Sequence, residues 1–277
     1  EHIATLLQNL LRAYNDPYQK TIEAAQVALS AVTAAIPKDD TSKSYISVIN
    51  DALETAGVVD YLPGFNQPNG LQPLLPLYRD ALLTGTQEER ELAAIGMKYM
   101  LNMTDPAMLK PYLQQIIGPL IRILMERSLS TPVRIAMLST LNLVIQKGSL
   151  ALRAFAAQLQ PTYVKYLLAP SKGVRDLAAE GVCLLLQLGA KPDFLLKDLI
   201  RTLKDPSNPA PESCLLAIKN TLKALAKSST QVQDATIAAL REAITPFTES
   251  SDENLRTIAG AALVRTYPNA PEESDEE

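Results

Sequence analysis

The chain has 277 residues, 47% of them apolar, which is enough to bury a large core and excludes an intrinsically disordered chain. Only 5% are aromatic and tryptophan is absent, while leucine and alanine are frequent, which favours close-packed helices over the strands of a sandwich. The net charge of −4 supplies no global basic field, so direct binding of nucleic acid is disfavoured.

Targeting and metal-binding signals are missing from the sequence. There is no signal segment and no uninterrupted apolar run of about 18 residues, so we expect a cytoplasmic protein without membrane contact. The first residue is Glu1 rather than Met, so we expect a piece of a longer protein. Cys183 and Cys214 lie among aliphatic residues and are predicted to be buried, reduced thiols. With only His2 beside them, they predict no metal site and no cofactor.

The N-terminal part of the chain predicts a helical pair over residues 1–36. Its second helix is expected to start with Asp16 as the N-cap and Pro17 as the first helical residue. An irregular insertion is expected over residues 37–70, with a possible short helix over 45–56.

Turn-forming residues fill the end of this insertion, from 60 to 70. Loops this long within a packed domain are usually functional or mobile. Two readings stay open: a connector whose Leu62 and Phe65 plug a groove, or a binding segment.

Residues 71–267 predict further helical pairs. The first pair, over 71–83 and 88–103, has Thr86 and Glu89 at capping-box spacing. The second, over 107–147, carries Pro119 inside an apolar helical stripe, where a proline is expected to bend the helix. Three more pairs follow, and the last has Ser250 and Glu253 as another expected capping box. The acidic tail over 268–277 is expected to be disordered.

Two landmarks repeat along these pairs with one period. Prolines inside helical patterns fall 43 and 42 residues apart, and arginines opening the following helices fall 44 and 41 residues apart. They are Pro76, Pro119 and Pro161, and Arg90, Arg134 and Arg175. A shared period of about 40 to 47 residues is typical of paired-helix repeats. The sequence therefore predicts an all-α, HEAT-repeat (armadillo-like) α-solenoid of roughly six helical pairs.

Catalytic patterns are absent from the sequence. None of the 11 glycines forms a phosphate-binding loop, and the single histidine stands at residue 2, badly placed for a nucleophilic triad. Carboxylate pairs such as Glu88-Glu89 fall in expected turns. We therefore predict a non-enzymatic protein with no small-molecule substrate, whose function is to bind other proteins.

Basic residues concentrate through the middle of this acidic chain, which suggests an acidic protein partner. Beside Lys110 and Lys147, seven are taken as candidate partner-binding residues: Arg122, Arg127, Arg134, Arg153, Lys165, Lys172 and Arg175. Arg134 and Arg175 have an alternative role, because each lies near the start of the second helix of a pair. Arginines at this position often bind acidic turn residues of the next repeat, which forms a polar ladder between repeats. Arg122 and Arg127 are freer to face outward.

Four stretches between roughly residues 60 and 188 carry a family likeness: Leu62-Pro63-Gly64-Phe65, GLQPLLPLYRDALLTG from Gly70, GPLIRIL from Gly118, and Gln158-Leu159-Gln160. Together they resemble the C-terminal HEAT region of the general control non-derepressible protein one family. Members of this family are giant, ribosome-associated activators of the kinase that phosphorylates translation initiation factor two in amino-acid starvation.

The resemblance implies a kinase-recruiting scaffold. In the family this region binds the RWD domain of the kinase through a basic residue, which carries over first to Arg122, with Arg127 and Arg134 next. Met125-Glu126-Arg127 departs from the Gly-Asp-Arg expected in relatives. Two alternatives remain: a HEAT adaptor for another cargo, and a structural spacer within a longer solenoid.

Overall fold

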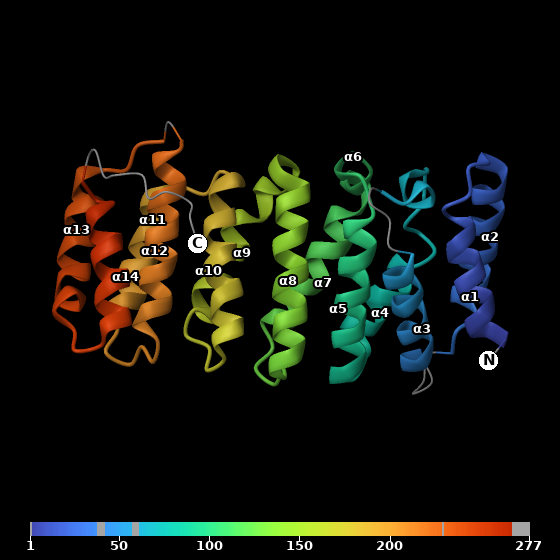
Figure 1. Ribbon diagram of the computed structural model, residues 1–277, viewed down its shortest axis with the longest axis horizontal. Helices are drawn as coiled ribbons and strands as arrows, with labels where there is room; N and C mark the ends of the chain where they lie inside the picture. Colours follow the sequence, from blue (N-terminus) through green and yellow to red (C-terminus); the bar gives the residue numbers. More distant parts are fainter. Residues whose placement is uncertain (1, 38–41, 57–60, 229, 268–277) are drawn as a thin grey trace. The chain divides into compact units, whose positions relative to one another are not determined.

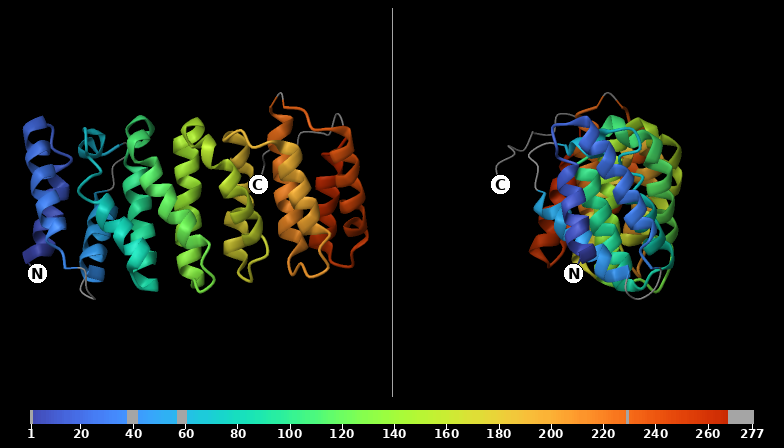
Figure 2. Two further views of the ribbon diagram at one scale, coloured as in Figure 1. Left: turned by 180° about the vertical axis from the view of Figure 1, so that it is seen from behind. Right: turned by 90° about the vertical axis from the view of Figure 1, so that its right-hand side faces the viewer.

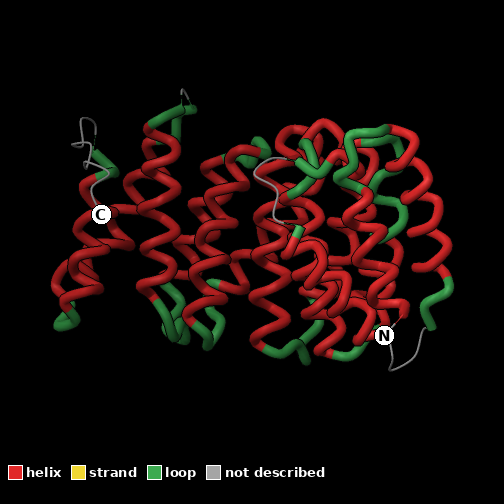
Figure 3. Tube along the Cα trace, turned by 45° about the vertical axis from the view of Figure 1, so that its right-hand side comes forward, coloured by secondary structure: helices red, strands yellow, loops and turns green. Residues whose placement is uncertain are grey.

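The computed structural model describes residues 2–37, 42–56, 61–228 and 230–267, and these residues form helices and loops without a strand (Figure 3). The predicted all-α fold is therefore confirmed. The chain divides into two compact units, Glu1–Ala151 and Leu152–Glu277. Each unit is built from two rows of helices.

In unit 1, the first row contains α1 (His2–Ala13), α3 (Ser42–Thr55), α5 (Gln87–Asn102) and α8 (Thr131–Gly148), each packed on the next (Figure 1). The second row contains α2 (Gln19–Ala34), α4 (Leu75–Thr84) and α7 (Leu113–Leu124). Successive first-row helices from α3 onward start 45 and 44 residues apart, which matches the period of the sequence landmarks.

Helix α3 takes a regular place in the first row. It begins three residues before the short helix expected at 45–56, and it buries Ile46, Ile49 and Leu53 between α1 and α5. Because three apolar side chains at steps of three and four face the core, α3 is an amphipathic helix of the same kind as its neighbours.

The connector after α3 packs into unit 1 through a short 3-10 turn, Pro63–Asn66. Leu62 and Phe65 are fully buried, and the Phe65 ring meets the Tyr14 ring edge-on at a centroid distance of 5.5 Å. The Gly64 amide donates to the Tyr14 carbonyl at 2.8 Å, and a Cβ on Gly64 would overlap the Tyr14 ring. The Leu-Pro-Gly-Phe motif thus anchors the connector against the end of α1.

Two local expectations are wrong in the structure. Asp16 accepts from the Tyr18 amide at 2.8 Å, but α2 begins only at Gln19, and no side chain caps its first turn. Asp252 rather than Ser250 caps α14 (Glu253–Val264), since its Oδ1 accepts from the Leu255 amide at 3.2 Å. Pro119 lies inside α7, and a 3-10 turn at Lys110–Tyr112, beside Pro111, precedes that helix.

The capping box at the start of α5 is confirmed. Thr86 Oγ1 accepts from the Glu89 amide at 3.3 Å, and Glu89 Oε2 accepts from the Thr86 amide at 2.8 Å. The two bonds satisfy donors that the first helical turn leaves open.

Unit 2 repeats the two-row arrangement, and its helices can be followed from behind in the left view of Figure 2. The first row holds α10 (Lys172–Gln187), α12 (Pro211–Ala226) and α14, and the second holds α9 (Ala156–Tyr166), α11 (Pro192–Leu203) and α13 (Asp234–Ile244). Neighbouring repeats are linked directly: Asp193 Oδ1 accepts from the Gln233 amide at 3.1 Å and from Thr236 Oγ1 at 2.6 Å.

Candidate protein interface

The seven candidate residues fall in both units. Three lie in unit 1, namely Arg122, Arg127 and Arg134, and four lie in unit 2, namely Arg153, Lys165, Lys172 and Arg175. The structure therefore places two separate groups of basic side chains, and each is described within its own unit.

Arg122 lies on the solvent face of α7. The helix buries its opposite face, and Arg122 is exposed in the last turn. One turn earlier, Gly118 has open space where a side chain would be. The Arg122 side chain has no polar partner in the part of the protein that the structure describes.

The loop after α7 carries an acidic side chain that is bound within the protein and a basic side chain that is not. Glu126 turns inward and accepts from Arg90 Nη1 at 2.7 Å. Arg127 is exposed and, among residues 2–37, 42–56, 61–228 and 230–267, its guanidinium has no partner. Met125 is 58% exposed between them. Arg122, Met125 and Arg127 therefore present two unpaired cations around an apolar side chain.

Arg134 is held closer to the protein than these two. It opens α8, is half-buried, and donates from Nη2 to the Arg127 carbonyl at 3.3 Å. Its Nε is buried without an acceptor within the described residues. The contact fixes the loop that carries Arg127, so Arg134 is placed to orient a neighbour more than to reach a partner.

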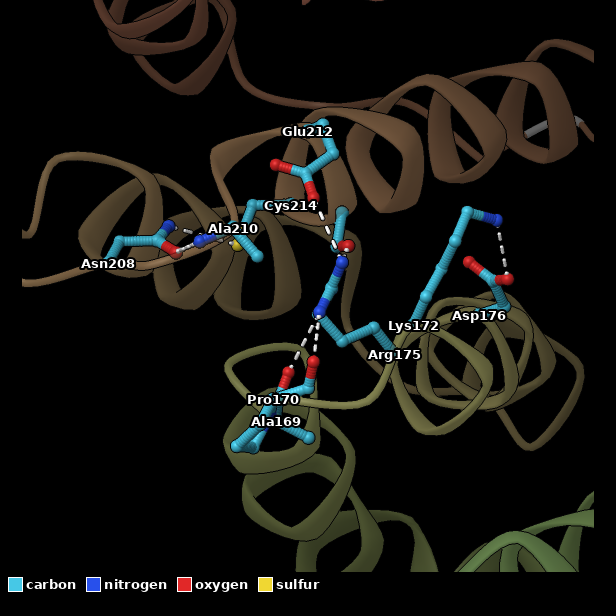
Figure 4. Close-up of polar contacts among 10 residues, drawn as sticks. Ala169, Pro170, Lys172, Arg175, Asp176, Asn208, Ala210, Glu212 and Cys214 are labelled. Atoms are coloured by element: carbon cyan, nitrogen blue, oxygen red, sulfur yellow. Dashed lines mark hydrogen bonds and ion pairs between the residues drawn. The ribbon is translucent and has the colours of Figure 1, made fainter. Parts of the chain in front are cut away.

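Arg175 makes the most extensive contacts of the seven (Figure 4). Its Nη1 donates to the Ala169 and Pro170 carbonyls at 3.0 and 2.9 Å. Its Nη2 lies 3.1 Å from Glu212 Oε1, and Nε donates to Ser213 Oγ at 2.9 Å. The side chain is 13% exposed. Arg175 thus joins the turn before α10 to the start of α12, which confirms the ladder alternative for this residue.

Arg90 is the equivalent ladder residue in unit 1. Its side chain is also 13% exposed, and it bridges α5 to Glu126, 36 residues further along the sequence. Arg175 and Glu212 are 37 residues apart. The sequence period marks both arginines, but it does not identify their acidic partners.

The other basic candidates of unit 2 are exposed. Lys172 pairs with Asp176 at 2.9 Å, an i,i+4 contact on the surface of α10 that stabilises the helix only weakly (Figure 4). Lys165 Nζ lies 5.1 Å from the centroid of the Tyr166 ring. Arg153 is exposed beside Gly189, and within the described part of unit 2 it has no polar partner.

Lys147, also part of the basic stretch of the sequence, closes the end of α5. Its Nζ donates to the carbonyls of Leu101, Asn102 and Thr104 at 2.6, 2.9 and 2.9 Å, and lies 5.1 Å from the Tyr61 ring centroid. Burial lowers its pKa, although the Asp105 charge opposes that effect. The ammonium of Lys147 therefore caps the C-terminal end of α5.

The acidity of the two cysteine thiols depends on their burial. Both are free thiols; Cys214 is buried and Cys183 half-buried. Burial raises the pKa of each thiol to about 11. Across the described residues there is no group of three or more His, Cys, Asp or Glu side chains that could hold a metal ion, and no helix long and apolar enough to cross a membrane.

Comparison with known proteins gives one consistent family. Residues 1–69 match the family model described as "Stalled ribosome sensor GCN1-like, HEAT repeats". Over 268 residues the chain is 32% identical to the eIF-2-alpha kinase activator GCN1 of Dictyostelium discoideum, covering 95% of this chain and 10% of that relative. Over nearly its whole length this chain is similar to a GCN1 protein.

The chain is similar to other proteins as well. It is 34% identical over 212 residues to the human Stalled ribosome sensor GCN1, covering 74% of this chain and 8% of the human protein. It thus spans about a tenth of the length of the curated relatives it matches. Among solved structures, a HEAT-like repeats protein from Thermococcus onnurineus NA1 aligns over 96% of the segment with 11% identity and a TM-score of 0.47.

Proposed function

We propose that this segment is a non-catalytic scaffold that binds the RWD domain of the starvation-responsive kinase of translation initiation factor two alpha. In the cytoplasm, it supports activation of that kinase on ribosomes, as part of the integrated stress response. The names of the Dictyostelium and human relatives, a kinase activator and a stalled-ribosome sensor, support this role, as does the resemblance seen in the sequence. Contact with the ribosome belongs to the parent protein.

One observation supports the proposal most directly: the exposed Arg122 and Arg127 lack polar partners among the described residues, whereas Arg90 and Arg175 are bound within the protein. A planar guanidinium with free donors pairs with carboxylates in a bidentate manner. In this proposal, Arg122 and Arg127 bind acidic residues of the RWD domain and Met125 adds apolar contact. Arg134 orients Arg127.

In unit 2, Arg153, Lys165 and Lys172 supply a second basic group that strengthens the encounter with an acidic partner. Arg175 contributes only by holding the turn that precedes Lys172. Because Arg175 makes its hydrogen bonds within the chain, the residues around it fit the alternative of a structural spacer better than a partner-binding role.

Titration calorimetry of the 277-residue protein against the isolated RWD domain tests this role, at low and at moderate salt. We expect saturable binding that weakens with salt, because the distance over which exposed charges are screened shortens from about 30 Å at 0.01 M to about 8 Å at 0.15 M ionic strength. Arg122→Glu should weaken binding by at least about tenfold. Lys20→Ala, which removes an exposed cation from α2, is the matched control and should bind as the unmodified protein does.

Absence of binding by a protein with an unchanged thermal melt would reject the scaffold and leave the spacer. Binding that Arg122→Glu and Arg127→Glu both leave unchanged would retain the scaffold but reject these arginines as the contact.

A further inference from the structure

The connector between α3 and α4 has a second half that the burial of Leu62 and Phe65 does not explain. After the 3-10 turn at Pro63–Asn66, residues 67–72 contribute one wall of a cleft of about 320 Å³. The opposite wall comes from α6 (Pro106–Leu109), the 3-10 turn that follows it and the first turn of α7. A cleft of this volume lies at the lower end of the range that proteins use for ligands.

Both walls of this cleft are held in place within unit 1. Asn66 Oδ1 accepts from the Asp105 amide at 2.9 Å, which ties the connector to the start of α6. On the other side of the connector, Gln26 of α2 donates from Nε2 to the Pro68 carbonyl at 3.0 Å. Because these contacts already fix the walls, a ligand does not have to order them, which lowers the entropic cost of binding.

Three amide side chains line this cleft without polar partners. Asn69, Gln72 and Gln115 are exposed, and within the part of the chain that the structure describes none of their side chains makes a hydrogen bond. Gln67, a fourth amide of the cleft, differs because its Oε1 accepts from Gln19 Nε2 at 2.8 Å. Each amide side chain carries an acceptor oxygen and two donor hydrogens. The donors and acceptors of Asn69, Gln72 and Gln115 are therefore open to a ligand.

The backbone at Asn69 places its amide in this cleft at some cost. Its φ of 61° is the only positive φ of a non-glycine residue among the residues that the structure describes. This left-handed conformation is disfavoured for L-residues. Two successive turns hold it, since the Gly70 amide donates to the Gln67 carbonyl at 2.9 Å and the Gln72 amide to the Asn69 carbonyl at 3.0 Å. Glycine would meet the same backbone requirement, so the turn alone does not call for the side chain of Asn69.

The cleft selects against charge. None of its described lining residues is charged, so an ionised ligand group would lose hydration without gaining an ion pair. Apolar contact is provided by Pro68, Pro111 and Met108, whose side chain is 39% exposed. Tyr112 also lines the cleft, but it is only 6% exposed and presents little ring face on which a sugar could stack. Amide groups beside small apolar surfaces fit an uncharged peptide better than a saccharide.

We propose that this cleft binds an extended, uncharged segment of a partner polypeptide, whose backbone N–H and C=O groups pair with the amides of Asn69, Gln72 and Gln115. An extended or polyproline segment leaves its backbone groups without internal hydrogen bonds. Each amide side chain can accept from a backbone N–H and donate to a backbone C=O. The connector then serves both roles that its sequence left open, because its first half plugs the core and its second half binds. No cation takes part, so this contact is independent of the proposed kinase contact.

A phage-displayed library of peptides of about twelve residues, selected on the full 277-residue protein, tests the cleft. We expect enriched sequences that are rich in proline and uncharged residues and lack helical periodicity. Binding of the strongest peptide, measured by fluorescence anisotropy, should weaken by at least about threefold in Gln115→Ala and in Asn69→Gly, and by at least about tenfold in the double variant. Gln114→Ala is the matched control, because Gln114 is the exposed neighbour on α7 that does not line the cleft, and it should bind as the unmodified protein does.

Two further measurements separate binding from folding and from charge. Asn69→Gly should keep the urea midpoint of the unmodified protein while it binds the peptide more weakly, because glycine adopts a φ of 61° readily. Raising the salt concentration should change the peptide's dissociation constant less than about twofold, since no ion pair is formed.

Several results would overturn the proposal. They are the absence of an enriched sequence, enrichment of charged or helical sequences, and peptide binding that neither Gln115→Ala nor Asn69→Gly weakens. Peptide binding that is lost in Arg122→Glu would move the site to the basic contact. Binding to a glycan array that is lost in Gln115→Ala would make a saccharide the occupant instead. Gln115 is exposed, so its alanine variant is expected to fold and keeps the test decisive even if Asn69→Gly does not fold.

Discussion

Gly96 of α5 lies against the ring of Tyr78 of α4, so close that a Cβ on Gly96 would stand 2.5 Å from Cε1 and Cζ of the ring. The same pair recurs 85 residues later, where a Cβ on Gly181 of α10 would overlap the Tyr163 ring of α9. Both tyrosines are fully buried. In each unit, therefore, one second-row helix inserts a tyrosine into a gap that a first-row glycine leaves open.

Gly96→Ala should destabilise the protein by about 1–3 kcal/mol, since the added methyl overlaps the Tyr78 ring and the Asn50 side chain. Gly118→Ala is the matched control inside α7, where nothing lies within 4 Å of the new Cβ. There alanine should stabilise the helix by about 0.5–1 kcal/mol. Urea unfolding midpoints measure both changes, and an equal shift for both variants would contradict the close packing.

Tyr78→Phe should cost about 1–3 kcal/mol of unfolding free energy. The Tyr78 hydroxyl donates to Asn50 Oδ1 at 2.9 Å, and Asn50 Nδ2 donates to the Leu92 carbonyl at 2.8 Å. Removing the hydroxyl leaves a buried amide oxygen without its donor. Tyr18→Phe, on a ring that is 73% exposed, should leave the urea midpoint unchanged. If Tyr78→Phe leaves the urea midpoint unchanged, another donor replaces the hydroxyl at Asn50 Oδ1.

The repeat period and the capping box at Thr86 were predictable because each depends on residues close in sequence. The expected N-cap at Asp16 is wrong because local propensity does not decide where a helix starts when neighbouring elements pack against it. Pro119 stays inside α7, and a 3-10 turn at Pro111 precedes that helix. Which second-row helices touch depends on the packed structure, and no local pattern reports that.

The candidate protein interface could likewise be predicted only in part from the sequence. The ladder alternative, offered for Arg134 and Arg175, holds for Arg175, which opens a first-row helix at the position equivalent to Arg90. Arg134 donates to the Arg127 carbonyl instead. Which arginines stay unpaired depended on distant residues: Glu126 turns to Arg90, and Arg127 is left exposed. Pairing of this kind joins residues about 36 apart and follows only from the packed structure.

Arg175→Ala should lower the unfolding free energy by about 2–3 kcal/mol, because a largely buried guanidinium with four polar partners is lost. Arg175→Lys should recover only part of this, since an ammonium lacks the planar fork. Arg122→Ala should change stability by less than about 0.5 kcal/mol. Thermal and urea melts compare the three, and a large loss in Arg122→Ala would make Arg122 a structural residue.

Glu89 should make stability depend on pH in the acid range. Hydrogen bonding from Ser42, first, and from Thr86 lowers the pKa of Glu89 below its ordinary value of 4.5. Its folded-state pKa is therefore below its unfolded one, so the stabilisation is complete above about pH 4.5 and is lost as pH falls through the folded pKa. Glu89→Gln keeps the capping geometry without the titrating group. The difference in urea midpoint between the unmodified protein and Glu89→Gln should narrow as the pH falls. A constant difference would contradict the lowered pKa of Glu89.

The two thiols should resist alkylation in the folded protein. Burial raises the pKa of both Cys183 and Cys214 to about 11 from 9.0, so deprotonation requires a pH higher than usual. Near pH 8 only about one thiol in a thousand is then a thiolate, against about one in ten when the protein is unfolded. Iodoacetamide should therefore react about a hundredfold more slowly with the native protein than in urea. Cys214 should be the slower of the two, because it is buried whereas Cys183 is half-buried. Mass spectrometry of peptides from a time course separates the two sites, and equal rates in native buffer and urea would show that neither thiol is protected by the fold.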